Sequence, residues 1–181
     1  EGCYACWVGH ACSIGARQPT PWAAGTYTNI TGFPSGVKCE PGRFQASEGK
    51  TACDACEVGA YCQAGATAAM PCQAGTFGDT TNLGSQSECT DCAAGAFCST
   101  GATSPSDCAP GTRQDRTGQS QCLECAAGSY QNETGRTACR ICPRGSYCAA
   151  GASAPLPCVG GTYSNQTGLQ SSDQCTDCPG L

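Results

Sequence analysis

Six pairs of cysteines in this 181-residue chain have the C-x-x-C spacing that is typical of metal and redox sites. Two such pairs can hold zinc through four thiolates, and one pair can exchange disulfides when a helix start activates a thiolate. The pairs are Cys3 and Cys6, Cys53 and Cys56, Cys89 and Cys92, Cys122 and Cys125, Cys139 and Cys142, and Cys175 and Cys178.

The surrounding sequence argues against both chemistries. C-x5-C units alternate with these pairs, and no helical periodicity is present. We therefore interpret each pair as the junction between two neighbouring disulfide loops. His10 is the only histidine, the carboxylates are scattered, and no nucleophile–base set or phosphate loop is present. The sequence predicts no catalytic residue, no metal site and no cofactor, so we do not expect an enzyme.

The composition is that of a disulfide scaffold. The 20 cysteines are about 11 % of the chain, whereas Leu, Ile, Val and Phe together are about 9 %, well below the roughly 20 % that packed domains need. Cross-links must therefore replace an apolar core, and disulfides persist only in oxidising compartments. We expect a protein that is secreted or lies on the extracellular surface.

Charge and hydropathy exclude two classes of partner. The net charge is −5, with nine Lys and Arg residues and no basic cluster. Neither nucleic acid nor an anionic membrane surface is therefore an expected partner. No apolar run in this segment approaches the roughly 18 residues that a membrane-spanning helix requires.

A long internal repeat organises the cysteines. Under a shift of 86 residues, every cysteine of the first half falls on a cysteine of the second half. In the reverse direction Cys108 and Cys122 find no cysteine, because Trp22 and Gly36 stand at their positions. The sequence thus predicts three parts: a super-repeat at 1–88 that lacks one disulfide, a second at 89–174, and the start of a third at 175–181.

Short hairpins are the expected elements. After most of the cysteines that begin a loop the chain reads x-x-Gly-x-aromatic, as in "CEPGRF", and later Thr-Gly or Glu-Gly pairs mark a return turn. Each longer loop between cysteines thus predicts a β-hairpin closed by a disulfide, and the Pro-containing segments 15–19, 101–105 and 151–155 predict extended linkers. The expected fold is small, disulfide-rich and mostly irregular, with short β-hairpins and no helical core, arranged as an elongated tandem-repeat rod.

The joint absence of cysteine at Trp22 and Gly36 favours one connectivity. If Cys108 bonds Cys122, losing both leaves no orphan thiol, and Trp22 covers the gap with apolar area. A crossed scheme, in which Cys108 bonds Cys92, is the alternative. Sequential pairing gives Cys6–Cys12, Cys39–Cys53, Cys56–Cys62, Cys72–Cys89, Cys92–Cys98, Cys108–Cys122, Cys125–Cys139, Cys142–Cys148 and Cys158–Cys175, and it leaves Cys3 and Cys178 unpaired or intermolecular.

Three sequons share the form N-x-T-G. They predict N-linked glycans at Asn29, Asn132 and Asn165, which agrees with a secretory route. The Thr- and Ser-rich segments favour O-linked glycans as well.

The phrase C-x-x-C-x-x-G-x-Y-C-x-x-G-A, continued by P-C-x-x-G-T-Y-S-N-x-T-G and Q-C-x-x-C, resembles the ephrin-receptor-like cysteine-rich repeat. That repeat is similar in style to the modules of the tumour-necrosis-factor receptors. Residues 139–178, 53–92 and, less completely, 3–39 carry the resemblance. It implies an extracellular, elongated, non-catalytic module, as in receptor ectodomains and in surface or filament proteins of protists and algae.

These observations favour a structural role. We expect a spacer or the subunit of a cell-surface filament, such as a flagellar hair or matrix fibre, whose partners are its own copies or neighbouring repeats of a longer chain. Cys3 and Cys178 would join copies head to tail, or in a longer chain would bond elsewhere. The alternative is a receptor or adhesin ectodomain that binds a protein ligand. Its candidate contact residues are Arg113, Arg136, Arg140 and Arg144.

Overall fold

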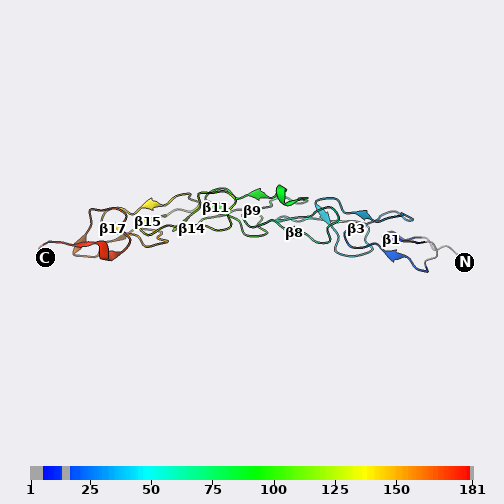
Figure 1. The fold of residues 1–181 in the computed structure, drawn as a ribbon, viewed down its shortest axis with the longest axis horizontal. Coiled ribbons are helices and arrows are strands. Elements are labelled where there is room, and N and C mark those ends of the chain that lie inside the picture. Colours follow the sequence, from blue (N-terminus) through cyan, green and yellow to red (C-terminus); the bar gives the residue numbers. More distant parts are fainter. Residues whose placement is uncertain (1–5, 14–16, 180–181) are drawn as a thin grey trace. The chain divides into compact units, whose positions relative to one another are not determined.

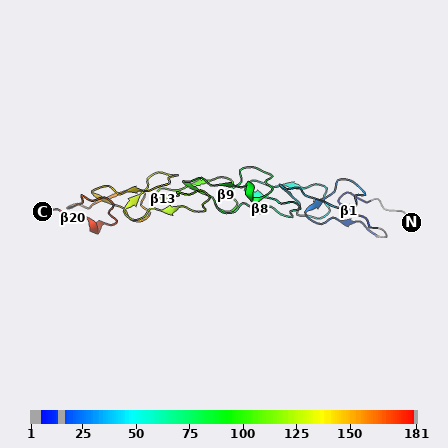
Figure 2. The ribbon, with the colours of Figure 1, turned by 45° about the horizontal axis from the view of Figure 1, so that its top comes forward.

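The computed structural model describes residues 6–13 and 17–179. Within these residues there is no α-helix, and twenty strands of two residues each form ten two-stranded sheets (Figures 1 and 2). Two single turns of 3-10 helix are also present, η1 (Gln86–Glu88) and η2 (Ser172–Gln174). The predicted small, disulfide-rich fold of short hairpins is confirmed, whereas its arrangement as a rod stays a prediction.

Each sheet is a hairpin of two strands that follow one another in the chain. The hairpins are β1 (His10–Ala11) with β2 (Thr20–Pro21), β3 (Thr26–Tyr27) with β4 (Val37–Lys38), β5 (Arg43–Phe44) with β6 (Asp54–Ala55), β7 (Ala60–Tyr61) with β8 (Met70–Pro71), β9 (Thr76–Phe77) with β10 (Thr90–Asp91), β11 (Ala96–Phe97) with β12 (Ser106–Asp107), β13 (Thr112–Arg113) with β14 (Leu123–Glu124), β15 (Ser129–Tyr130) with β16 (Arg140–Ile141), β17 (Ser146–Tyr147) with β18 (Leu156–Pro157), and β19 (Thr162–Tyr163) with β20 (Thr176–Asp177).

The chain divides into two compact units that are interleaved in sequence. The first unit takes in the residues up to Gln73 together with Phe77–Thr90 and Thr100–Ser104. The second takes in Ala74–Thr76, Asp91–Ser99 and the residues from Pro105 on. Both units are built from the same kind of hairpin, and the super-repeats at 1–88 and 89–174 stay a prediction from the sequence.

A glycine with positive φ stands just before the first strand of each hairpin. In the first unit Gly42 has a φ of +86°, and a Cβ atom there would lie 2.3 Å from the carbonyl oxygen of Asn82. In the second unit Gly128 also has a φ of +86°, and its Cβ would lie 2.4 Å from the carbonyl oxygen of Gly168. Only glycine meets both demands, because it tolerates this φ and leaves room for another backbone.

Backbone hydrogen bonds link each hairpin to the next within a unit. In the first unit the Gly42 N–H donates to the Cys62 carbonyl at 2.8 Å, and the Cys56 N–H donates to the Gly42 carbonyl at 2.9 Å. The Gly65 N–H donates to the Cys39 carbonyl at 2.7 Å. The second unit repeats these bonds between Gly128 and Cys148, Cys142 and Gly128, and Gly151 and Cys125. The polar backbone of these irregular loops is thereby satisfied.

Disulfides take the place of an apolar core. The ten largest fully buried side chains among the described residues are all cysteines. The clustered core of the first unit consists of Tyr61, Cys72, Leu83 and Cys89. The hairpins bury little apolar area, so disulfides and the backbone contacts of the glycines hold them together.

The prediction of extended linkers at 101–105 and 151–155 is wrong. Each segment is the turn of a hairpin, between β11 and β12 and between β17 and β18. Gly101 and Gly151 allow these turns with φ of +73° and +71°. A C-x5-C unit therefore begins a hairpin in the same way as the longer loops do. For segment 15–19, residues 15 and 16 lie outside the described residues.

Candidate functional site: hairpin clamps and sequon turns

The two cysteines of a C-x-x-C pair belong to different hairpins. Cys53 bonds back to Cys39, whereas Cys56 bonds forward to Cys62. The pair is thus a junction at which one hairpin ends and the next begins. Among the residues that the structure describes, no three His, Cys, Asp or Glu side chains are grouped as metal ligands would be.

Nine disulfides are formed, each between Cα atoms 5.6 to 6.0 Å apart. In the structure they follow the sequential scheme. They join Cys6 to Cys12, Cys39 to Cys53, Cys56 to Cys62, Cys72 to Cys89, Cys92 to Cys98, Cys108 to Cys122, Cys125 to Cys139, Cys142 to Cys148 and Cys158 to Cys175.

Cys178 is the free cysteine of the described residues, and its side chain is partly exposed. Its N–H donates to the Gly161 carbonyl at 2.8 Å. The disulfide-bonded Cys142 makes the same backbone contact, to Gly128. Cys178 therefore occupies the position at which a hairpin begins. Cys3 lies outside the described residues.

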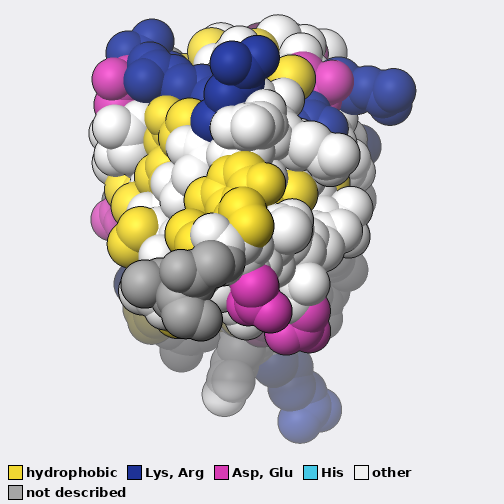
Figure 3. Space-filling model, turned by 90° about the vertical axis from the view of Figure 1, so that its left-hand side faces the viewer, with side chains coloured by type: hydrophobic (Ala, Val, Ile, Leu, Met, Phe, Trp, Pro, Cys, Tyr) yellow, Lys and Arg dark blue, Asp and Glu magenta, His cyan; other side chains and the backbone are white. Residues whose placement is uncertain are grey.

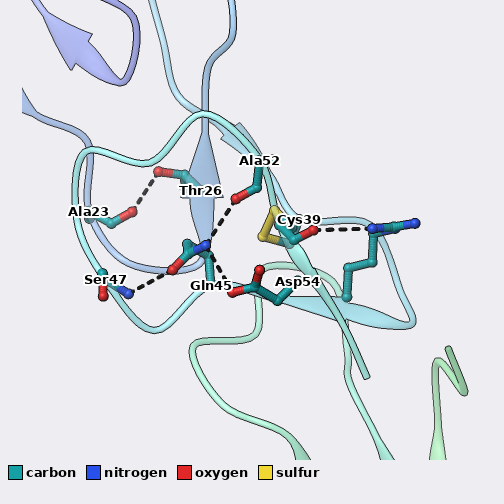
Figure 4. The surroundings of a disulfide bond; sticks show 9 residues. Ala23, Thr26, Cys39, Gln45, Ser47, Ala52 and Asp54 are labelled. Carbon is teal, nitrogen blue, oxygen red and sulfur yellow. Dashed lines mark hydrogen bonds between the residues drawn. A yellow bond between two sulfur atoms is a disulfide. The ribbon is translucent and has the colours of Figure 1, made fainter. Parts of the chain in front are cut away.

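A buried glutamine clamps three of the longer hairpins. In a C-x5-C unit the first cysteine bonds the sixth residue after it, but the sixth residue after Cys39 is Gln45, which is 5 % exposed. The Gln45 Nε2 donates to the Ala52 carbonyl at 2.9 Å, and its Oε1 accepts from the Ser47 N–H at 3.0 Å (Figure 4). The side chain thus ties the outgoing arm of the hairpin to its turn and to its returning arm.

The second unit repeats this clamp twice. Gln114 is 3 % exposed, its Nε2 donates to the Gln121 carbonyl at 2.8 Å, and its Oε1 accepts from the Arg116 N–H at 3.2 Å. Gln131 makes the equivalent bonds to Ala138 and Glu133, at 2.7 and 3.1 Å. Local sequence patterns do not predict the clamps, although the fixed spacing of a glutamine six residues after a cysteine is a signal for them.

Trp22 stands where the other longer hairpins of this kind have a cysteine. Its N–H donates to the Gly9 carbonyl at 2.9 Å, just as the Cys39 N–H donates to Gly25. A Cβ atom on Gly36 would lie 3.1 Å from Cδ2 of Trp22, so the half-buried indole lies against this glycine. The indole thus fills the place of the missing bridge.

The three sequon asparagines occupy one position of the hairpin. Each is exposed and lies directly after the residue that faces inward, six positions after the cysteine or Trp22 that begins the hairpin. Asn29 follows Thr28, which is 3 % exposed, and Asn132 follows Gln131, which is 2 % exposed. Asn165 follows Ser164 in the same way. The glycans themselves stay a prediction.

The candidate arginines are only partly brought together. Arg140 lies 3.4 Å from the Glu133 carboxylate, which also pairs with Arg136. Arg113 pairs instead with Asp115 in another hairpin, at 3.2 Å. Ion pairs exposed to this degree contribute little to stability.

His10, the one histidine of the sequence, contacts Trp7 edge to face, with 5.9 Å between the ring centroids.

One comparison with known proteins bears on this chain. Residues 111–154 match the family described as tyrosine-protein kinase ephrin type A/B receptor-like. The match and the nine disulfides support the presence of ephrin-receptor-like cysteine-rich repeats, as in an extracellular cysteine-rich repeat protein. No curated protein matches the chain. In the part that the structure describes, none of the helices could span a bilayer.

Proposed function

We propose that the chain is a structural, non-enzymatic segment of an extracellular glycoprotein, acting as a spacer or as the subunit of a cell-surface filament or matrix fibre. The observation that carries this proposal is the structural role of the residues that recur along the chain. In the part of the chain that the structure describes, the repeated glycines pack one hairpin on another, and the repeated cysteines and glutamines fix single hairpins. Repeats that contact only their neighbours favour a linear array.

Small-angle scattering of the 181-residue chain tests the spacer proposal. A compact chain of this length has a radius of gyration of about 16 Å. We expect a value more than twice as large, and a value near that of a compact domain would contradict a linear array.

Covalent polymerisation is tested separately, on natively isolated material. We expect disulfide-linked multimers that disappear in the Cys178→Ser variant, because Cys178 is then unable to bond Cys3 of the next copy. A Cys178 joined to peptides absent from this sequence would instead indicate neighbouring repeats of a longer chain.

Exposed apolar side chains favour a second candidate, a receptor or adhesin ectodomain that binds a protein ligand. In the second unit Ile141 is 70 % exposed and Val159 is 59 % exposed. Figure 3, which looks onto the end marked C in Figure 1, shows hydrophobic side chains gathered on the nearest face. An alanine scan that included Ile141, Val159, Arg136 and Arg140 would give a localised loss of ligand binding in this case, whereas a spacer would show none.

A further inference from the structure

The sequon at Asn29 lies in a patch of apolar side chains. Asn29 lines a hollow together with Tyr27, Ile30, Phe33 and Val37. Ile30 is 59 % exposed, Phe33 38 % and Val37 37 %. Clusters of exposed apolar side chains usually mark a contact site. We therefore expect another group to cover this patch.

The backbone places Tyr27 and Asn29 on the same face. Thr28 lies between them and points inward, since its Oγ1 accepts a hydrogen bond from the Gly9 N–H at 2.9 Å. Successive side chains of an extended segment point to opposite faces, so Tyr27 and Asn29 both point outward, about 7 Å apart. A sugar on the Asn29 amide nitrogen would therefore lie beside the Tyr27 ring.

Among the six described hairpins with a longer loop, that of β3 and β4 is the one whose two arms no disulfide joins. In the four C-x5-C hairpins the disulfide spans the outgoing arm alone. The two arms of the β3–β4 hairpin are held by the Tyr27–Val37 register and by the Trp22 contact with Gly36. The sequon at Asn132 offers the contrast. Its hairpin is closed by the Cys125–Cys139 disulfide, and its neighbours are charged, with Glu133 paired to arginines.

We propose that the first N-acetylglucosamine of the Asn29 glycan packs the C–H face of its ring on Tyr27, covers Phe33 and Val37, and so holds closed the hairpin that lacks a disulfide. This inference rests on the proposed N-glycosylation. Aromatic faces carry negative charge density and attract the positive C–H groups of a sugar. The removal of apolar area from water adds to the contact.

Native-state proteolysis of the full chain, produced in a eukaryotic secretory host, tests the proposal. Trypsin cuts at Lys38, in β4, only when this hairpin opens. Thr31→Ala removes the sequon but leaves Asn29 and the patch intact, and we expect it to raise the cleavage rate at Lys38 at least three-fold. The matched control is Thr134→Ala, which removes the sequon at Asn132. It should change the cleavage rate at Arg140, in β16, by less than two-fold.

Two further variants separate the glycan contact from a general effect of glycosylation. In a Tyr27→Ala background the Thr31→Ala change should no longer affect cleavage at Lys38, because the ring on which the sugar packs is gone. Installing the missing bridge with Trp22→Cys and Gly36→Cys should also cancel the effect. In the unaltered protein the N-acetyl methyl protons of the Asn29 sugar should show a ring-current shift by NMR.

Mass spectrometry of the Asn29 peptide distinguishes the ways in which the account can fail. An unmodified Asn29 would overturn the glycosylation predicted at this residue and this inference with it. A glycosylated Asn29 whose loss leaves cleavage at Lys38 unchanged would overturn this inference alone. An effect that persists in the Tyr27→Ala background, or a protein partner on the patch of the glycosylated chain, would also overturn it.

Discussion

The indole of Trp22 lies against Gly36, with its Cδ2 only 3.1 Å from where a Cβ atom of that residue would stand. Eighty-six residues further along the chain, the corresponding positions carry the Cys108–Cys122 disulfide. An aromatic contact has thus replaced a covalent bond. We expect Trp22→Ala to destabilise the β3–β4 hairpin by about 1–3 kcal/mol, because half-buried aromatic area is lost. Hydrogen exchange of the hairpin amides measures this, and Trp7→Ala, at a position 62 % exposed, serves as the control.

The glutamine clamp predicts a second loss of stability. Gln114→Ala removes two hydrogen bonds, one to the Gln121 carbonyl and one from the Arg116 N–H, so we expect a destabilisation of about 1–3 kcal/mol. Urea unfolding followed by hydrogen exchange of the β13–β14 amides gives the value. Gln166→Ala changes an exposed glutamine and should stay within about 0.5 kcal/mol of the unaltered protein. Equal effects of the two variants would contradict the clamp.

Alanine substitutions at three glycines distinguish the cost of backbone strain from the cost of a steric clash. Gly161→Ala, at a φ of +88° with open space around it, should cost about 1–2 kcal/mol from strain alone. Gly128→Ala adds a Cβ atom 2.4 Å from a carbonyl oxygen and should be clearly worse or prevent folding. Gly160→Ala, which has neither problem, should be close to neutral. If Gly128→Ala were no worse than Gly161→Ala in thermal unfolding, the backbone-on-backbone packing would be wrong.

The contact between Trp22 and Gly36 also predicts how a disulfide can be replaced. Removing Cys108 and Cys122 together, both as alanine, should cost about 3 kcal/mol in the chain-entropy account. The double change Cys108→Trp and Cys122→Gly should recover part of that loss, because it copies the Trp22–Gly36 contact. Midpoints of unfolding in guanidinium compare the two variants. No recovery would mean that Trp22 does not substitute for the bridge.

Much of the fold could be predicted because short sequence patterns within each hairpin specify its turn and its first strand. The spacing of glycine after cysteine indicates a turn followed by a short strand, and nearly every hairpin contains both signals. The prediction of linkers at 101–105 and 151–155 fails because strands of two residues show no periodicity that could reveal a returning arm.

Contacts between hairpins could not be predicted in this way. The approach of Asn82 to Gly42 depends on how hairpins further along the chain are stacked, which no local pattern contains. Gln45 reads as a surface residue, and its burial depends on partners such as Ala52 in the returning arm. The sequons and their shared N-x-T-G turns, by contrast, are visible in the sequence, whereas the burial of Thr28 and Gln131 just before two of the asparagines is not.

The central claim is that the cysteines pair in sequential order, with each disulfide lying within one hairpin. Digestion of natively isolated protein without reduction, followed by mass spectrometry of the joined peptides, tests it most directly. The account predicts that peptides containing Cys108 are joined to Cys122, and those containing Cys39 to Cys53. A peptide that joins Cys108 to Cys92 would contradict the sequential order and, with it, the explanation of Trp22.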